Sequence, residues 1–161
     1  MDDKIRNGIG AAIGQIPSGL FILTSRHEDK RTGMLASWAQ QVSFEPPMVS
    51  VAVAKGRPVM AMISASRQFG LCQIPKGDKR IMRKFASGID PAEDPFLGFD
   101  LVENTETHVP ILAQVLSYLE CHLVSHIDVE ADHNLIIGNV VGGNFVGGDP
   151  EIRTRKDGFK Y

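Results

Sequence analysis

The sequence lacks a dominant charge and lacks any long run of apolar residues. Its 161 residues include 17 Lys and Arg and 19 Asp and Glu, which gives a formal net charge of -2 at pH 7. This near balance argues against binding of nucleic acid or anionic membranes through net positive charge. No stretch approaches the roughly 20 apolar residues that span a bilayer. The start, Met1-Asp2-Asp3-Lys4, carries acid where a secretory signal carries positive charge, so we expect a soluble, cytoplasmic protein.

Cysteine is also scarce, and its placement excludes the common metal-binding patterns. Cys72 and Cys121 lie in apolar, strand-like sequence with no close pairing motif, which is typical of buried thiols in a reducing compartment; a disulfide is the alternative. Histidines follow at His122, His126 and His133. Neighbouring residues of a strand point to opposite faces, and neither a Cys-x-x-Cys nor a paired-His spacing is present. We therefore expect no metal site.

What the chain does contain is a succession of short β-type segments. The length and the 43% hydrophobic content suit a single domain, residues 1–161. Helical patterns cover 3–14, where Pro17 ends the helix, then 58–66 and about 79–87. Strands are expected over 19–25, 34–43, 48–54, 69–74, 111–130 and 134–145, with a charged turn at 27–32 and an irregular loop at 88–110 of the kind that often helps to form a site. The pattern predicts a mainly β protein, a barrel with two or three short helices.

The segment 48–58 predicts an anion site beside a strand. Alternate positions of the strand carry valines, and the positions between them carry small side chains, so one face packs a core and the other leaves room. The valines are Val49, Val51 and Val53, and the small residues are Ser50, Ala52 and Ala54. Lys55, Gly56 and Arg57 follow, and Pro58 suits the first position of a helix, whose free N–H groups attract phosphate. A flat, phosphorylated ligand suits this arrangement.

Taken in order, several short motifs resemble those of the flavin reductase-like, FMN-binding split-barrel domains. The motifs are Ser18-Gly19-Leu20, Gly33-Met34-Leu35-Ala36-Ser37-Trp38, Val42-Ser43-Phe44-Glu45-Pro46-Pro47, Arg57 before a helix, Phe69, Phe85, Pro110-Ile111-Leu112, Leu119-Glu120-Cys121, Asp132-His133 and Tyr161. The phrase Ala54-Lys55-Gly56-Arg57 and the tail 155–161 are most similar to the reductase domain at the end of diflavin flavoproteins. The resemblance covers essentially the whole chain and implies a split β-barrel of Greek-key type.

The resemblance also implies a homodimer with one FMN near each subunit interface, and it assigns residues to the cofactor. In this family the segment Ser37, Trp38, Ala39 and Gln40 runs along the isoalloxazine ring and ribityl chain. Ala54, Lys55 and Arg57 form the phosphate loop, and His133 reaches toward the ring or the nicotinamide. The residues alone also allow other interpretations. Trp38 could equally lie in the core or at a dimer contact. Lys55 and Arg57 could be solvated residues of a turn, and His133 could be an ordinary turn residue.

The function implied is an NAD(P)H-dependent flavin reductase. Hydride passes from a reduced nicotinamide to flavin N5, and electrons continue to free flavin, a metal complex or a redox protein partner. FAD is possible in place of FMN. The alternative is a flavoredoxin-like electron-transfer module that holds FMN tightly and turns over no nicotinamide. A third hypothesis is a non-redox member that binds a pyridoxal derivative or haem.

Overall fold

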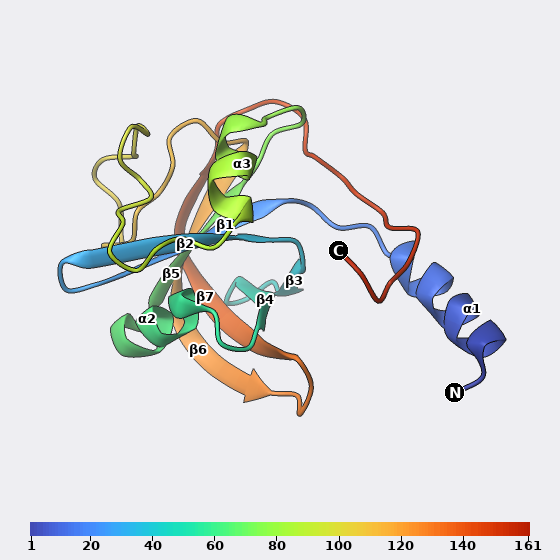
Figure 1. Ribbon diagram of the computed structural model, residues 1–161. Coiled ribbons are helices and arrows are strands. Elements are labelled where there is room, and N and C mark those ends of the chain that lie inside the picture. Colours follow the sequence, from blue (N-terminus) through green and yellow to red (C-terminus); the bar gives the residue numbers. More distant parts are fainter.

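The fold is a curved antiparallel sheet of seven strands with three helices around it, shown in the computed structural model of residues 1–161 (Figure 1). The helices are α1 (Asp3–Gly14), α2 (Pro58–Ser66) and α3 (Arg80–Ala86). The strands are β1 (Phe21–His27), β2 (Lys30–Ala36), β3 (Ala39–Ser43), β4 (Met48–Ala54), β5 (Gln68–Gln73), β6 (Ser117–Asp128) and β7 (His133–Phe145). The expected mainly β architecture with short helices is confirmed.

The strand order β2-β1-β5-β6-β7-β4-β3 makes the sheet a split barrel. The part β5-β6-β7-β4 is a Greek key, because β4 connects through α2 to the far strand β5 and itself lies beside β7. No ladder joins the two edge strands β2 and β3, although they follow one another in the chain. The barrel is therefore open between them, where Ser37 and Trp38 connect the two edges.

Two apolar cores fix the sheet. In the first, the alternating valines of β4 pack under α2 together with Phe69, and Val51 and Val53 are fully buried. In the second, α3 and the loop 88–116 cover the other end of the sheet, and Phe85 lies beside Phe96 with ring centroids 5.5 Å apart. Cys72 and Cys121 are both buried and free, which confirms the packing role expected for them. No helix is long and apolar enough to cross a lipid bilayer.

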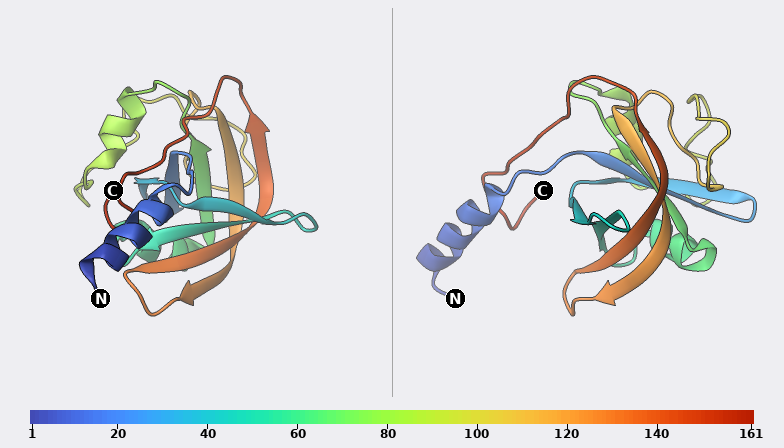
Figure 2. Two further views of the ribbon diagram at one scale, coloured as in Figure 1. Left: turned by 90° about the vertical axis from the view of Figure 1, so that its right-hand side faces the viewer. Right: turned by 180° about the vertical axis from the view of Figure 1, so that it is seen from behind.

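Helix α1 and the C-terminal tail form an arm that stands away from the barrel (Figure 2). Asp2 caps the helix, and its carboxylate accepts a hydrogen bond of 2.7 Å from the Lys4 N–H. The tail runs back along α1, where the Arg155 N–H donates to the Gly14 carbonyl over 2.7 Å and the Gly158 N–H donates to the Gly10 carbonyl. Glycine lets the two backbones approach, because a Cβ on Gly14 would lie 2.2 Å from the Arg155 carbonyl oxygen.

The structure corrects the predicted ends of several strands. The strand expected over 34–43 is two strands, because the chain bends at Ser37 and the Trp38 carbonyl accepts a hydrogen bond of 2.9 Å from the Ala52 N–H of β4. The charged turn expected at 27–32 is confined to Glu28 and Asp29, since Glu28 takes a left-handed conformation with φ of 56°. β1 begins at Phe21 and not at residue 19.

The region after α3 also differs from expectation. β6 begins at Ser117 and not at 111, because residues 111–116 are an irregular segment that buries Ile111 and Leu112 in the second core. The loop 88–110 is irregular as expected, yet none of its residues lines the main cavity; it contributes Phe96 and Val109 to the core instead. Length alone does not distinguish a loop that covers a core from one that forms a site.

Candidate flavin site

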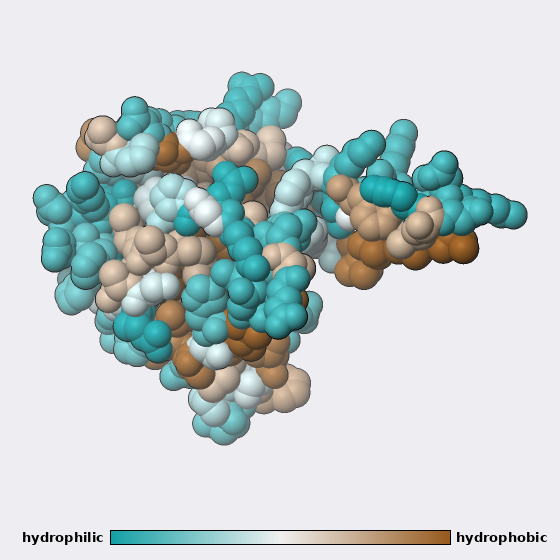
Figure 3. Space-filling model, turned by 60° about the horizontal axis from the view of Figure 1, so that its bottom comes forward, coloured by the Kyte–Doolittle hydropathy of each residue, from teal (hydrophilic) through white to brown (hydrophobic).

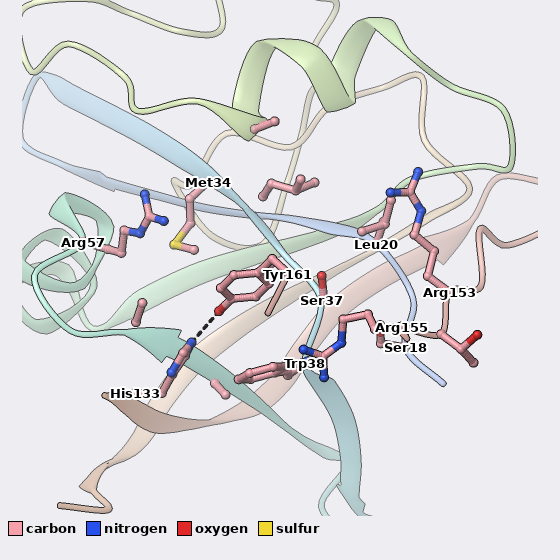
Figure 4. Close-up of a pocket in the computed structure, with 16 residues that line it drawn as sticks. Ser18, Leu20, Met34, Ser37, Trp38, Arg57, His133, Arg153, Arg155 and Tyr161 are labelled. Carbon is pink, nitrogen blue, oxygen red and sulfur yellow. Dashed lines mark hydrogen bonds between the residues drawn. The ribbon is translucent and has the colours of Figure 1, made fainter. Parts of the chain in front are cut away.

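The main cavity lies at the split of the barrel and has a volume of about 470 Å³ (Figure 4). Its walls come from the end of β2, the Ser37-Trp38 connection, β4, Arg57 just before α2, the start of β7 and the C-terminal tail. Small-molecule sites commonly measure about 300–1,000 Å³, so the cavity is large enough for a cofactor. Segments far apart in the sequence meet here because the Greek key brings β7 against β4.

Two of the three small side chains predicted to leave room do so, whereas Ser50 is buried and does not line the cavity. Ala52 and Ala54 line the cavity from β4, while the valines that alternate with them face the first core. The exposed Trp38 ring lies beside the alanines, with its centroid 4.8 Å from that of His133. Together they form a shallow wall of small groups next to one large aromatic face, which suits the stacking of a flat ring.

The centre of the cavity holds the Tyr161 ring. It stacks on Trp38 at a centroid distance of 5.6 Å and an interplanar angle of 25°, and its hydroxyl lies 2.6 Å from His133 Nε2. On the other side of the imidazole, His133 Nδ1 lies 2.7 Å from the Asp132 carboxylate. A carboxylate only accepts, so Nδ1 donates to Asp132, and the neutral imidazole accepts from Tyr161 at Nε2.

The groups at both ends of this hydrogen-bonded chain have shifted pKa values. The hydrogen bond from His133 holds the pKa of the exposed Asp132 carboxyl below its usual value. Burial raises the pKa of the Tyr161 phenol, and the negative charge of Asp132 raises it further, while Arg57 and Arg155 oppose the shift. The Tyr161 phenol therefore keeps its proton at neutral pH and is available as the donor to His133 Nε2.

The two predicted phosphate-binding cations are placed differently. Arg57 precedes α2, lines the cavity and takes part in none of the seven ion pairs of the structure. Lys55 does not line the cavity; its Nζ donates to Asp128 over 2.8 Å, and this hydrogen bond lowers the pKa of the Asp128 carboxyl. α2 begins at Pro58 as the sequence predicted, but no residue of α2 itself lines the main cavity; Pro58 and Val59 line a smaller neighbouring pocket that shares Arg57.

Of all the residues that the family resemblance assigns to the cofactor, some line the cavity and others do not. Ser37, Trp38, Ala54, Arg57 and His133 meet at the cavity, whereas Ala39, Gln40 and Lys55 do not line it. Ala39 packs against the first core instead, and Gln40 is exposed on β3. The register explains this, because β3 turns away from the cavity to pair with β4.

Sequence reasoning gave no role to the tail residues that complete the cavity. Arg153, Thr154, Arg155 and Tyr161 all line it, together with Ser18. The tail shows no hydrophobic period that would place it, and its position depends on the close contact between Gly14 and Arg155. One sequence signal could have located the tail. Gly10 and Gly14 are four residues apart and so lie on one face of a helix, which indicates that another segment packs closely against that face.

Comparison with known proteins agrees with this geometry. Residues 13–155 match the flavin reductase like domain family. The chain belongs to that family. The diflavin flavoprotein A 1 of Synechocystis is 35% identical over 153 residues, which are 93% of this chain and 26% of that protein. This flavin reductase-like domain thus spans about a quarter of the length of the curated relatives it matches.

Solved structures show the same fold. The NADH:FAD oxidoreductase of Streptomyces globisporus superposes with a TM-score of 0.83 at 25% identity, over 96% of this chain and 91% of that one. A second structure of that oxidoreductase, in complex with NAD and FAD fragments, gives a TM-score of 0.80 at 24% identity over the same shares of the two chains. The predicted split barrel is confirmed, and the domain has a flavin-binding fold.

Proposed function

We propose that this flavin reductase-like domain binds FMN in the main cavity and is an NAD(P)H-dependent flavin reductase. One observation carries the proposal: a cavity of about 470 Å³ with an alanine wall, an exposed tryptophan ring and arginines as its only permanently charged lining residues. This lining is complementary to a flat ring that carries a phosphate. FAD could bind in the same way, because it has the same ring as FMN and differs only by an added adenylate.

The residues present suit particular parts of the cofactor. Arg57, at the N-cap of α2, would hold the phosphate, and Ala52 and Ala54 leave space for the ring beside Trp38. Bound flavin supplies the redox chemistry, with hydride accepted at N5. The tasks left to the chain are to bind, to orient the ring and to limit water, so we assign His133 to hydrogen bonding at the ring edge and Ser37 to the cavity wall along the ribityl chain.

The test is reconstitution with excess FMN, followed by removal of unbound flavin and measurement of the visible spectrum and stoichiometry. We expect about one flavin per chain, and bleaching of the spectrum when NADH or NADPH is added without oxygen. Protein that neither retains FMN nor oxidises either nicotinamide would refute the proposal. Arg57→Gln serves as the matched variant, since it removes the cation and keeps a polar side chain of similar reach.

The electron-transfer module is the second candidate, and the position of Tyr161 favours it. The phenol ring stacks on Trp38 and lines the cavity, so it occupies an aromatic face that a nicotinamide could otherwise use. Rapid mixing separates the two functions. A carrier stays oxidised when mixed with NADH or NADPH and is reduced by dithionite or a reduced redox protein, whereas a reductase is bleached by the nicotinamide.

We also propose that the domain forms a homodimer, as the family resemblance implies. Isoleucines form an exposed stripe along α1 at Ile5, Ile9 and Ile13, and Figure 3 shows apolar atoms gathered on one side of the arm. An arm of this kind gains stability by covering its apolar side with a second subunit. Sedimentation measurements on the wild type and on Ile9→Glu test the dimer.

We propose that the electron acceptor is free flavin, a metal complex or a redox protein. We also propose a cytoplasmic location, because free buried thiols suit a reducing compartment.

A further inference from the structure

Helix α3 and the turn before it carry a cluster of cations on the side that faces solvent. The helix buries Ile81 and Phe85 in the second core. Residues 76–84 hold five cations and one acid, Asp78, although the chain as a whole has a net charge of -2. The Asp78 carboxylate is engaged locally, since it accepts a hydrogen bond of 2.9 Å from the Ile81 N–H. We call the five cations the basic face of α3: Lys76, Lys79, Arg80, Arg83 and Lys84.

Most of this charge has no acidic partner within the chain. Lys84 is the only member of the basic face that forms an ion pair, and its partner is Glu93. Arg80 is held by uncharged groups, because its guanidinium donates to the Gly98 carbonyl over 2.6 Å and lies 4.3 Å from the centroid of the Phe99 ring. The other three cations of the basic face are exposed and available to an anion outside the chain.

The stability of the helix does not account for the basic face. Arg83 and Lys84 lie in the last turn of α3, where the helix dipole favours positive charge. Lys79 and Arg80 lie at the start of the helix, where the dipole disfavours positive charge, and the first turn contains no acid. The cations at the start of α3 therefore call for a reason outside the helix itself.

The basic face adjoins the main cavity. Helix α3 runs along one side of the cavity in Figure 4, and its last residue, Ala86, lines the cavity. A guanidinium nitrogen of Arg153, another lining residue, lies 3.4 Å from the sulfur of Met82 on α3. Arg153 also pairs with Glu151 over 3.2 Å, so the charge at this junction is balanced in part. A protein bound to the basic face would lie beside the cavity.

Charge and position together favour an acidic redox protein as the partner. Complementary charges steer two proteins together and raise the rate of association. Proteins that exchange electrons meet through small, short-lived interfaces, which do not need a large apolar area. Residues 76–86 match this description, since none of their large apolar side chains is exposed. Nucleic acid is a poorer match, because the basic face lies on one helix of seven residues in a chain of net negative charge.

We propose that the basic face of α3 is the docking surface for an acidic one-electron redox protein that takes electrons from flavin in the main cavity. This inference rests on the proposed function, because it needs a reduced flavin beside α3, and it selects the redox protein among the three proposed acceptors. Overall, one NAD(P)H and two oxidised partner proteins give NAD(P)+, one proton and two partner proteins reduced by one electron each.

The test uses cytochrome c in two forms that contain the same haem. The native form has a basic surface, and the succinylated form has an acidic one. The FMN-loaded protein is first reduced with a stoichiometric amount of dithionite, so that no nicotinamide is needed, and is then mixed with either form in a stopped-flow instrument. We expect the reduction rate of the succinylated form to fall about tenfold when the salt concentration rises from about 10 to about 150 mM, because charges are then screened beyond about 8 Å. The rate with the native form should not fall.

A charge-reversal variant and a matched control locate the contact. Lys79→Glu with Arg83→Glu reverses two exposed charges of the basic face, and Arg26→Glu with Lys30→Glu makes the same change in net charge on the exposed β1–β2 hairpin. None of the four residues lines the main cavity, so both variants should keep the wild-type affinity for FMN. With the succinylated form at low salt, we expect the rate to fall at least about tenfold in the α3 variant and less than about twofold in the control.

A neutral pair of substitutions, Lys79→Gln with Arg83→Gln, tests the same surface without placing an acid in the last turn of α3. We expect a loss of about threefold in the rate with the succinylated form. This pair replaces the charge-reversal variant if that variant does not fold.

Calorimetry with flavin-free protein separates this proposal from the proposed function. If the protein retains no FMN but binds succinylated cytochrome c in a manner that depends on Lys79 and Arg83, the proposed function is refuted and the docking surface stands. Three results would overturn the docking surface: the same salt dependence with both forms of cytochrome c, α3 variants that behave like the hairpin control, or tighter binding of a DNA duplex of about 20 base pairs than of succinylated cytochrome c at about 150 mM salt.

Discussion

The hydroxyl of Tyr161 lies 2.6 Å from His133 Nε2, which fixes the last aromatic ring of the sequence over the middle of the cavity. The same ring stacks on Trp38, so the surface that a flat ligand needs is covered by the chain itself. A ligand ring therefore stacks directly on Trp38 only when Tyr161 moves aside. We expect this relationship to affect how fast a flat ligand reaches the Trp38 ring.

We predict that Tyr161→Ala opens the cavity. The Trp38 ring loses its stacking partner and becomes more accessible to water, so its emission shifts to longer wavelength, and FMN associates several-fold faster in stopped-flow mixing. Tyr161→Phe keeps the ring and loses only the hydrogen bond to His133, so we expect a smaller change. Tyr118→Phe, in the second core, removes a hydroxyl elsewhere and is the control. Unchanged emission and association rate in Tyr161→Ala would exclude a covering role.

The pH dependence of the Tyr161 phenol gives a second prediction. Burial raises its pKa above the usual value of about 10, so the proton is held more tightly in the folded protein than in the unfolded chain. Its contribution to stability is present below the unfolded pKa and is lost as the pH rises through the folded pKa. Subtracting the phenolate absorbance of Tyr161→Phe from that of the wild type isolates the transition. A midpoint at or below 10 would contradict the assignment.

The alternation of β4 and the start of α2 could be predicted from sequence because local rules determine both. Side chains of a strand alternate between faces, and Pro58 fits only the first turn of a helix, so the valine core, the alanine wall and the place of Arg57 all followed. The break at Ser37 could not be predicted, since 34–43 contains neither proline nor glycine to mark it. The bend follows from pairing with β4, which is a long-range contact.

Long-range contacts also explain the site residues that sequence did not place. Lys55 and Arg57 look equivalent in the sequence, but Asp128, 73 residues further along, pairs with Lys55 and leaves Arg57 for the cavity. The tail joins the site by packing on α1 through glycines and by pairing its backbone with Ser18. Such placements depend on tertiary packing and leave no periodic signal in the residues concerned.

The unequal placement of the two cations leads to a third prediction. Arg57→Ala removes a cation that lines the cavity and should weaken FMN binding by about 10- to 100-fold, the range expected for hydrogen bonds to a charged group. Lys55→Ala removes a side chain already paired with Asp128 and should change FMN binding less than about threefold. Equilibrium titration of flavin fluorescence measures both. Equal losses in the two variants would show that Lys55 turns to the phosphate.

A fourth prediction concerns the thiols of Cys72 and Cys121. Burial raises the pKa of each to about 12, so the reactive thiolate is rare in the folded protein. At a pH of about 8 we expect no reaction with an aromatic disulfide reagent on the time scale of minutes, and two thiols per chain after denaturation. Rapid labelling of native protein, or fewer than two thiols after unfolding without reductant, would contradict the packing role of these residues.

The last prediction tests whether α1 positions the tail. A Cβ added at Gly14 would lie 2.2 Å from the Arg155 carbonyl oxygen and 3.0 Å from its carbon, and both are main-chain atoms that cannot yield by rotating a side chain. Gly14→Ala should therefore push the tail away from α1, break the 2.7 Å hydrogen bond from the Arg155 N–H, and withdraw Tyr161 from Trp38.

The matched control for this change is Gly8→Ala, because no atom lies within 4 Å of a Cβ at Gly8. The same substitution there should favour α1 by up to about 1 kcal/mol through helix propensity and leave the tail in place. Trp38 emission and the rate of proteolysis in residues 150–161 report the tail. We expect red-shifted emission and faster cleavage in Gly14→Ala only. If both variants keep the wild-type emission and cleavage rate, the arm does not determine where Tyr161 and Arg155 lie, and the tail is held by its backbone pairing with Ser18 and its contacts with Trp38 and His133.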